Sequence, residues 1–185
     1  MDYLYAILAG YALGAPPFAC WLASLRGVDL TRLGTGNPGA ANLFRQVSRP
    51  LGVLAIGLDG AKGALAVLAG GWIGLSDGAT LVPGVAAVVG HMHSPFLGFR
   101  GGAGLATTLG VGLAASPLAG PIAFSVGVTA TLLGRNVGRG SGYGWALYVI
   151  IAPFLGERWY VIVGIVGLGA ALLVRALLLE RLRDR

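Results

Sequence analysis

The sequence predicts an all-α integral membrane protein with about seven transmembrane helices, and three observations lead to this fold class. First, 56% of the 185 residues are hydrophobic and only 11% are charged, whereas about 25% of residues are charged in an average soluble domain. Second, apolar runs such as 159–179 reach the roughly 20 residues that a helix needs to cross a bilayer. Third, most of the arginines lie in every second connection between the hydrophobic segments, and an odd number of membrane crossings explains this distribution. Residues 1–185 are therefore expected to form a single polytopic membrane domain.

Seven hydrophobic segments follow one another along the chain, and each is predicted to form a helix. The first segment lacks the positively charged start of a signal peptide, so we expect it to be retained. The fourth and sixth segments would barely cross a hydrocarbon core of about 30 Å, and we expect them to begin beside a buried loop that lines a cavity. The segments lie at about 3–25, 51–75, 79–97, 104–116, 117–134, 143–155 and 159–179.

The connections and the small residues complete this picture. Glycine contributes 33 of the 185 residues, far above the usual share of about 7%, and small residues allow helices in lipid to approach closely. The only connection of substantial length is about 26–50, and the sequence contains no convincing long internal repeat. Cys20 is the only cysteine, which excludes a disulfide framework and a cysteine metal cluster.

The distribution of charge predicts the orientation in the membrane. The net charge is +6, and Lys62 is the only lysine. One set of connections carries only Asp2, Asp77, Glu157 and Arg158, whereas the other set carries most of the arginines. By the positive-inside rule, the N-terminus is outside and the C-terminus is cytoplasmic in the inner cell membrane. The basic surplus thus reflects topology, and no nucleic acid is expected as a partner. The cytoplasmic arginines are Arg26, Arg32, Arg45, Arg49, Arg100, Arg135, Arg139, Arg181, Arg183 and Arg185.

Three short stretches combine glycine with arginine, at 32–37, 100–104 and 135–142. Glycine lets backbone N–H groups turn toward a ligand, and arginine adds a fixed positive charge, a combination that suits a phosphate. The predicted topology places all three stretches on the cytoplasmic face. They are therefore expected to form one anion site there.

The first of these loops offers several hydrogen-bonding groups. Thr35, Asn37 and Asn42 are neutral hydrogen-bonding residues, and Arg45 offers a charged fork. The alternative is a polar connection built from turn residues, with an arginine placed only by topology. Both interpretations remain open from the residues alone.

His91 precedes the second stretch and is a candidate for acid–base chemistry. Beside a phosphate loop, a histidine can donate a hydrogen bond or act as a general base; a structural role is the alternative. His91 and His93 are two residues apart and do not share a helix face, and no acidic or cysteine ligands cluster near them. We therefore predict no metal site.

Asp59 and Lys62 are predicted to face one another inside the second segment. A spacing of three residues puts both side chains on one helix face. An unpaired charge at membrane depth is expensive, so an ion pair is expected. A structural pair and a direct contact with substrate both remain open.

These motifs together resemble the PlsY family, the bacterial acyl-phosphate-dependent glycerol-3-phosphate acyltransferases. The family loop G-S-G-N-x-G-x-x-N-x-x-R is matched over 34–45, with Thr35 at the serine position. The family motif D-x-x-K-G is matched over 59–63, and G-H-x-x-P-x-F-L-x-F-x-G-G-K-G is matched over most of 90–104. A later pattern, R-x-V-S-L-x-S, is partly matched over 135–141. The resemblance spans nearly the whole chain with its motifs in order.

The sequence departs from the family pattern at four places. Ala103 stands where the family has lysine, Gly138 replaces the first serine of the later pattern, and the proline is shifted by one position to Pro95. The family's C-terminal stretch with asparagine, histidine and basic residues is not recognisable in 177–185. Loss of a charged contact to phosphate from the position of Ala103 is expected to weaken the activity.

The resemblance implies an enzyme that moves a fatty acyl group from acyl phosphate to glycerol-3-phosphate, giving lysophosphatidic acid for phospholipid synthesis. It implies no covalent acyl-enzyme, no metal and no cofactor, with membrane lipid as a further partner. The oligomeric state is left open, and a monomer is compatible with the sequence. The resemblance and the loop chemistry together assign catalytic roles to Thr35, Asn37, His91 and Ser141. The residues expected to bind substrate are Gly36, Asn42, Arg45, Asp59, Lys62, Arg100, Gly101, Gly102, Gly104 and Arg135.

Two other functions remain as alternatives at this stage. Ala103 and the altered C-terminus favour a catalytically impaired relative that binds a phosphorylated lipid or metabolite. A small membrane transporter would explain charged residues deep in a membrane segment, but the absence of a long repeat argues against it.

Overall fold

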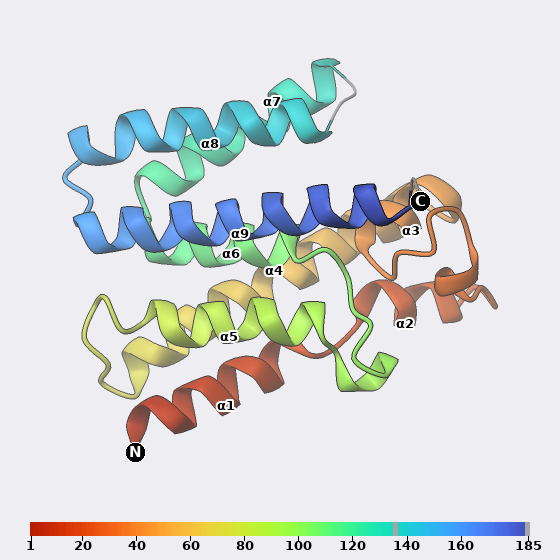
Figure 1. The fold of residues 1–185 in the computed structure, drawn as a ribbon, viewed down its shortest axis with the longest axis horizontal. Coiled ribbons are helices and arrows are strands. Elements are labelled where there is room, and N and C mark those ends of the chain that lie inside the picture. Colours follow the sequence, from red (N-terminus) through yellow and green to blue (C-terminus); the bar gives the residue numbers. More distant parts are fainter. Residues whose placement is uncertain (135–136, 184–185) are drawn as a thin grey trace. The chain divides into compact units, whose positions relative to one another are not determined.

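The structure is a computed structural model that describes residues 1–134 and 137–183, and every regular element in these ranges is a helix (Figure 1). For residues 131–132, 137–139, 141 and 176–183, only the backbone is described. The chain divides into two compact units, Met1–Val111 and Gly112–Arg185.

The first unit contains three long helices and several short ones. α1 packs against α5, and α4 contacts α1, α3 and α5. The short helices lie in the connections, where the candidate site is found. The elements are α1 (Asp2–Gly14), α2 (Phe18–Ser24), the 3₁₀ turn η1 (Leu30–Arg32), α3 (Ala40–Gln46), α4 (Arg49–Trp72), α5 (Leu81–Met92), the 3₁₀ turn η2 (Pro95–Leu97) and most of α6 (Leu105–Ala115).

The second unit continues from the end of α6 through α7 (Ala119–Gly134), α8 (Val137–Phe154) and α9 (Trp159–Arg183). α7 and α8 pack closely through glycine: a Cβ added to Gly144 would lie 3.3 Å from the Cα of Gly127. The buried Ser116 donates a 2.6 Å hydrogen bond to the Glu157 carboxylate, which ties the α8–α9 connection to the start of α7.

The first predicted segment, 3–25, is not one continuous helix. α1 ends at Gly14 and α2 begins at Phe18, with Pro16 and Pro17 between them. Proline has no backbone N–H and disfavours helical backbone at the preceding residue, so two consecutive prolines interrupt the helix. The interruption leaves carbonyl oxygens without helical partners, and two of them take part in the site described below.

Two further parts of the chain differ from the prediction: the connection at 26–50 and the start of the sixth helix. The connection at 26–50 contains η1 and α3, which are too short to give a clear hydrophobic periodicity. The sixth helix was predicted at 143–155, but α8 begins at Val137, so its first turns include part of the third glycine and arginine stretch. Arg135 of that stretch lies outside the described residues.

Several glycines of the first unit lie where helices approach closely. A Cβ on Gly14 of α1 would collide with the carbonyl of Ala87 on α5, and one on Gly63 of α4 would collide with the carbonyl of Thr107 on α6. These contacts agree with the expectation that small residues bring the helices together.

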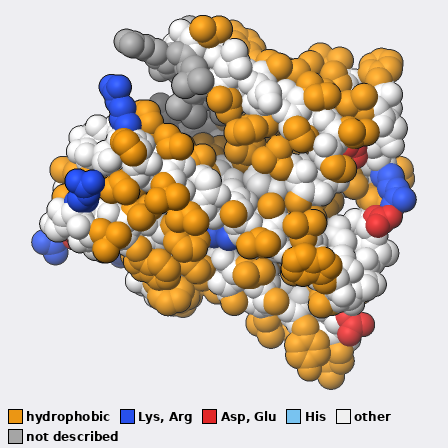
Figure 2. Space-filling view, turned by 180° about the vertical axis from the view of Figure 1, so that it is seen from behind, with side chains coloured by type: hydrophobic (Ala, Val, Ile, Leu, Met, Phe, Trp, Pro, Cys, Tyr) orange, Lys and Arg blue, Asp and Glu red, His pale blue; other side chains and the backbone are white. Residues whose placement is uncertain are grey.

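Much of the described surface is apolar. Large hydrophobic side chains such as Leu68, Trp72 and Val163 are exposed, and hydrophobic atoms cover much of the face shown in Figure 2, with few charged side chains among them. Two helical segments are long and apolar enough to cross a membrane, Asp2–Ser24 and Arg49–Trp72, and shorter apolar helices follow them. Such a surface is what a bilayer solvates well and water does not.

Candidate functional site

The loop at 34–42 is organised by the buried side chain of Asn42. Its amide nitrogen lies 3.2 Å from the Leu30 carbonyl oxygen, 2.8 Å from that of Leu33 and 3.1 Å from that of Asn37. Its amide oxygen accepts a 3.4 Å hydrogen bond from the backbone N–H of Thr35. Both ends of the Asn42 amide are thus engaged inside the loop.

The glycines of this loop supply backbone shape. Gly34 and Gly36 have φ angles of +58° and +69°, which an L side chain adopts only with strain. A Cβ on Gly34 would also lie 2.6 Å from the amide oxygen of Asn42. Glycine at this position therefore permits both the turn and the close approach of Asn42.

Thr35, Asn37 and Arg45 lie around this framework. Asn37 accepts a 3.0 Å hydrogen bond from the backbone N–H of Gly39, which is a local turn, and the Thr35 hydroxyl accepts one of 3.4 Å from the backbone N–H of Asn37. Thr35 is exposed, and Arg45 is exposed on α3. The loop thus keeps Thr35 and Arg45 at its surface.

Acidic and basic side chains are buried together at the middle of α4. The Lys62 ammonium lies 2.8 Å from Asp59 Oδ1, with side-chain exposures of 4% and 2%. The contact is a buried ion pair. His91 Nδ1 of α5 lies 3.5 Å from the same Asp59 oxygen. The predicted pairing of Asp59 with Lys62 is confirmed, and His91 joins it.

The interruption between α1 and α2 supplies further partners for this cluster. Lys62 donates a 2.8 Å hydrogen bond to the Pro16 carbonyl, and the buried Ser94 hydroxyl donates one of 2.6 Å to the Ala15 carbonyl. The ammonium also lies 5.6 Å from the centre of the Phe18 ring, at a distance typical of cation–π contact. No sequence motif pointed to Pro16 or Ser94 as part of the site, although the Pro16-Pro17 pair is a visible signal in the sequence.

The loop at 98–104 packs directly on His91. A Cβ on Gly101 would collide with the His91 carbonyl, and one on Gly102 would collide with His91 Nε2. Only glycine at both positions allows this contact. A change in the position of the His91 ring would therefore move the loop.

The backbone N–H groups of this loop are not arranged as the sequence led us to expect. Gly101 N–H donates to the Met92 carbonyl at 2.9 Å, and Gly102 N–H donates to the His91 carbonyl at 3.2 Å. These bonds satisfy carbonyls at the end of α5. These two N–H groups are therefore engaged within the protein. Arg100 is exposed, and Ala103 is half-buried.

The structure thus brings the predicted residues together in two groups within the first unit. In the first group, Asn42 holds the loop that contains Thr35, Gly36 and Asn37. In the second group, Lys62 and His91 contact Asp59, and Gly101 and Gly102 pack on His91. Gly104, with a φ of +88°, ends the second loop at the start of α6. Arg135 lies outside the described residues, and only the backbone of Ser141 is described.

A hollow of about 530 Å³ lies beside the two loops, lined by residues of 20–31 and by Phe96 and Leu97. The predicted site residues are not among those lining it. Asp29 is one of the lining residues, and hydrogen bonds from the Thr31 hydroxyl and N–H, with help from Arg32, lower its pKa. Among the described residues, no group of three or more acidic, histidine or cysteine side chains could hold a metal ion.

Comparisons with known proteins match this fold and most of the chain. A family model described as glycerol-3-phosphate acyltransferase matches residues 4–183. Glycerol-3-phosphate acyltransferase 1 of Deinococcus radiodurans is 44% identical over 138 residues, which cover 75% of this chain and 70% of the relative. The glycerol-3-phosphate acyltransferase of Thermosipho melanesiensis is 36% identical over 162 residues, covering 88% of this chain and 80% of the relative.

Solved structures agree. The crystal structure of PlsY (YgiH), an integral membrane glycerol 3-phosphate acyltransferase, in its glycerol 3-phosphate form has a TM-score of 0.84 and 32% identity. It aligns with 100% of this chain and 93% of its own. The lysophosphatidic acid form of the same protein gives a TM-score of 0.83 at the same identity and coverage.

The helical fold and these matches define an integral membrane acyltransferase. The chain belongs to the glycerol-3-phosphate acyltransferase family, known as PlsY. The resemblance drawn from the motifs is therefore confirmed, as is the assignment as an enzyme. The comparisons give no support to the transporter alternative.

Proposed function

We propose that this chain transfers a fatty acyl group from acyl phosphate to the 1-hydroxyl of glycerol-3-phosphate, releasing lysophosphatidic acid and phosphate. The observation that carries the proposal is the match of the family model over residues 4–183. In this reaction, the acceptor hydroxyl oxygen bonds to the acyl carbonyl carbon, the bond from that carbon to the phosphate oxygen breaks, and the hydroxyl proton leaves to a base. The leaving phosphate or His91 is the candidate base.

In this proposal, the two polar groups of the first unit have different roles: one contacts substrate and the other positions the loops. Thr35, Asn37 and Arg45 contact substrate, because Thr35 and Arg45 are exposed on the first loop and arginine suits a phosphate. Asn42 holds that loop in place through its three carbonyl partners. Arg100 adds a further exposed cation, and catalysis depends on positioning and on stabilising the charge that develops on oxygen.

Asp59, Lys62 and His91 act mainly as positioning residues in this scheme. Their charges neutralise one another inside the protein. His91 packs against Gly101 and Gly102 and so supports their loop. This arrangement explains why ionisable residues stand within an apolar helix, where an unpaired charge would be costly.

The membrane arrangement that accompanies this function has seven crossings, with the N-terminus outside and the active site facing the cytoplasm. The asymmetry of the arginines supports it. The interrupted pair α1 and α2 counts as the first crossing, because together they form one apolar segment, Asp2–Ser24. The whole chain then acts as one membrane domain.

The direct test uses the purified full-length protein with palmitoyl phosphate. Phosphate release and lysophosphatidic acid are measured with and without glycerol-3-phosphate, and we expect both products only when the acceptor is present. Phosphate release that is independent of the acceptor would indicate hydrolysis, and no release at all would favour the impaired relative. Ala103 gives a specific reason to include that second candidate, because alanine adds no charge to a loop in which the Gly101 and Gly102 N–H groups are already used.

A further inference from the structure

Two hydrogen bonds join α1 to the segment that follows α5. The Tyr11 hydroxyl of α1 donates a 2.6 Å hydrogen bond to the His93 carbonyl. In the opposite direction, the buried Ser94 hydroxyl donates one of 2.6 Å to the carbonyl of Ala15, which directly follows α1. Tyr11 and Ala15 are four residues apart and lie on one face of the helix, and the two residues they bind are consecutive. We call this pair of bonds the α1 clasp.

The bond from Ser94 is the buried half of the α1 clasp. Ser94 is 1% exposed and Ala15 is 3% exposed, so loss of the hydroxyl would leave the Ala15 carbonyl buried without this partner. The PlsY pattern has proline at the position of Ser94, and here the proline follows at Pro95. The bond is therefore a feature of this chain that the family pattern does not contain.

The backbone carbonyl of Ser94 holds the turn that leads into the loop at 98–104. It accepts hydrogen bonds from the N–H groups of Leu97 at 3.1 Å and Phe99 at 2.8 Å. Phe99 has a φ of +64°, the one positive φ of a non-glycine residue in the part of the chain that the structure describes. Such a backbone is strained and persists only where neighbouring contacts fix it. Arg100 follows directly, so Ser94 fixes both the loop against α1 and the turn before Arg100.

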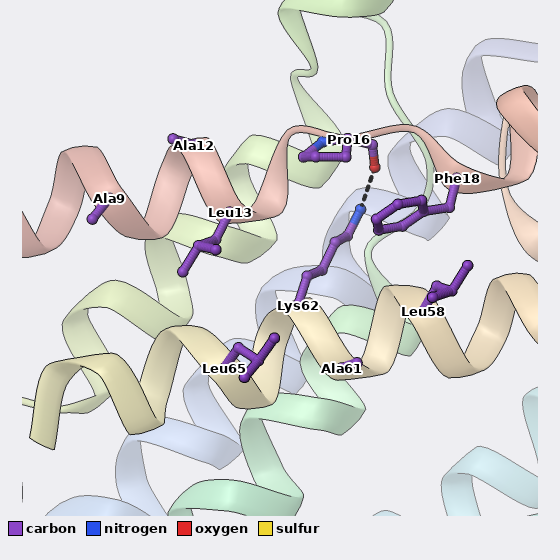
Figure 3. Close-up of a pocket in the computed structure, with 9 residues that line it drawn as sticks. All are labelled: Ala9, Ala12, Leu13, Pro16, Phe18, Leu58, Ala61, Lys62 and Leu65. Carbon is purple, nitrogen blue, oxygen red and sulfur yellow. Dashed lines mark hydrogen bonds between the residues drawn. The ribbon is translucent and has the colours of Figure 1, made fainter. Parts of the chain in front are cut away.

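The interruption after α1 also holds the charged cluster of α4. Figure 3 shows the Lys62 side chain reaching from α4 to the Pro16 carbonyl, where it donates a 2.8 Å hydrogen bond. Lys62 lies 2.8 Å from Asp59 Oδ1, and His91 Nδ1 lies 3.5 Å from that oxygen. Because Ala15 and Pro16 are consecutive, the loop at 98–104 and the charged cluster are tied to one short piece of backbone. Loss of the α1 clasp would release the loop from it and leave the Lys62 bond in place.

We propose that Ser94, together with Tyr11, is a positioning residue that holds the loop at 98–104 where Arg100 contacts the phosphate of glycerol-3-phosphate. The inference rests on the proposed function and adds to it two residues that contact no substrate. Without the α1 clasp, the loop is fixed by α5 alone and occupies its binding position in a smaller fraction of molecules. The apparent affinity for glycerol-3-phosphate falls by that fraction, whereas kcat changes little because bound substrate selects the positioned loop.

The first test separates positioning from stability. In the purified full-length protein with palmitoyl phosphate as donor, Ser94→Ala is expected to raise the KM for glycerol-3-phosphate about tenfold, with kcat changed less than twofold. Ser116→Ala is the matched control, because Ser116 is also buried and its hydroxyl also donates a 2.6 Å hydrogen bond, in the second unit. Both variants are expected to lower the thermal unfolding temperature in detergent, and only Ser94→Ala is expected to raise the KM. The same KM in both variants, or a loss in kcat alone, overturns the proposal.

A second set of variants tests whether the α1 clasp acts through Arg100. Arg100→Gln alone is expected to raise the KM for glycerol-3-phosphate, and adding Ser94→Ala to it is expected to raise the KM less than twofold further, because no cation remains to be positioned. Fully multiplicative effects would count against the proposal. Tyr11→Phe removes the other bond of the clasp at a partly exposed side chain and is expected to raise the KM about threefold. If Ser94→Ala does not fold, an unchanged KM in Tyr11→Phe overturns the proposal.

Binding measured without turnover distinguishes this inference from the proposed function. Glycerol-3-phosphate is titrated calorimetrically into the purified wild-type protein, Ser94→Ala and Ser116→Ala, and only Ser94→Ala is expected to bind about tenfold more weakly. This shift without any formation of lysophosphatidic acid would reject the proposed function and retain the role of Ser94. Acyl transfer with equal affinities in all three proteins would retain the proposed function and reject the role of Ser94. A wild-type protein that binds no glycerol-3-phosphate would overturn both.

Discussion

Ala103 is a position where one side chain is expected to affect the strength of anion binding. The PlsY motif carries lysine at this position, and here the Gly101 and Gly102 N–H groups donate to carbonyls at the end of α5. The loop therefore keeps its shape while offering less positive charge. Arg100 adds a cation at its start but stands three residues away, so it does not replace a lysine at 103 directly.

Ala103→Lys is predicted to raise kcat/KM for acyl transfer by about tenfold or more, because a hydrogen bond to a charged group contributes about 1.5–3 kcal/mol. Steady-state kinetics in both substrates measure it. A change in KM alone would indicate uniform binding, and a change in kcat would indicate a contact made in the transition state. Ala103→Met is the matched control, since it adds length without charge. A lysine variant that folds normally and gains nothing would contradict this prediction.

The pair formed by Asp59 and Lys62 leads to a prediction about unpaired charge. Removing one partner of a buried pair costs about 3–5 kcal/mol, whereas replacing both partners costs much less. Lys62→Met is therefore expected to lower the thermal unfolding temperature in detergent strongly, and Asp59→Asn combined with Lys62→Met is expected to recover part of the loss. In the double variant His91 faces a neutral amide in place of the carboxylate, so the recovery is incomplete. Equal losses in the single and double variants would show that the charges do not depend on each other.

At the scale of elements, the site depends on how α5 ends. The α5 carbonyls of His91 and Met92 are satisfied by the glycine loop, while Ser94 and Tyr11 tie the same region to α1: Tyr11 donates a 2.6 Å hydrogen bond to the His93 carbonyl. Helix ends need such partners for their orphan carbonyls. The loop is therefore positioned by the helix that precedes it.

Gly102→Ala tests this arrangement. The new methyl group would collide with the His91 ring, so we predict a loss of more than about nine-tenths of the acyltransferase activity, with the protein still inserted in the membrane. Gly57→Ala is the control, because the space around Gly57 on α4 is open and alanine favours a helix by roughly 1 kcal/mol over glycine. Full activity in Gly102→Ala would mean that the loop does not depend on contact with His91.

The sequence predicted the helical class, the short fourth helix and the pairing of Asp59 with Lys62, because these follow from hydropathy and from spacing along one helix. It did not predict that His91 would join the pair or that Ala15 and Pro16 would accept hydrogen bonds. Those contacts join residues 32 or more positions apart, such as Asp59 with His91, and no local pattern encodes them. The positions of Asn42, Gly101 and Gly102 also depend on which residues the fold brings near them. No local sequence pattern shows those neighbours.

At the scale of the whole molecule, the membrane topology decides whether the polar loops can work together. The proposed seven crossings place the connections around 26–50 and 98–104 on the cytoplasmic side, where phosphorylated substrates are available. An even number of crossings would divide the arginines between the two sides. The proposed orientation is therefore a condition for the proposed function.

Cysteine labelling in intact cells tests this topology. In a Cys20→Ser background, which removes the only cysteine, single cysteines are introduced at Asp77 and at Arg100, one on each side of α5. A membrane-impermeant maleimide is expected to label the cysteine at 77 in intact cells and the cysteine at 100 only after the membrane is opened. The physical reason is the retention of arginine-rich connections in the cytoplasm during insertion. Labelling of both positions from the same side would mean that α5 does not cross the membrane between them, and the arginine asymmetry would then need a different explanation.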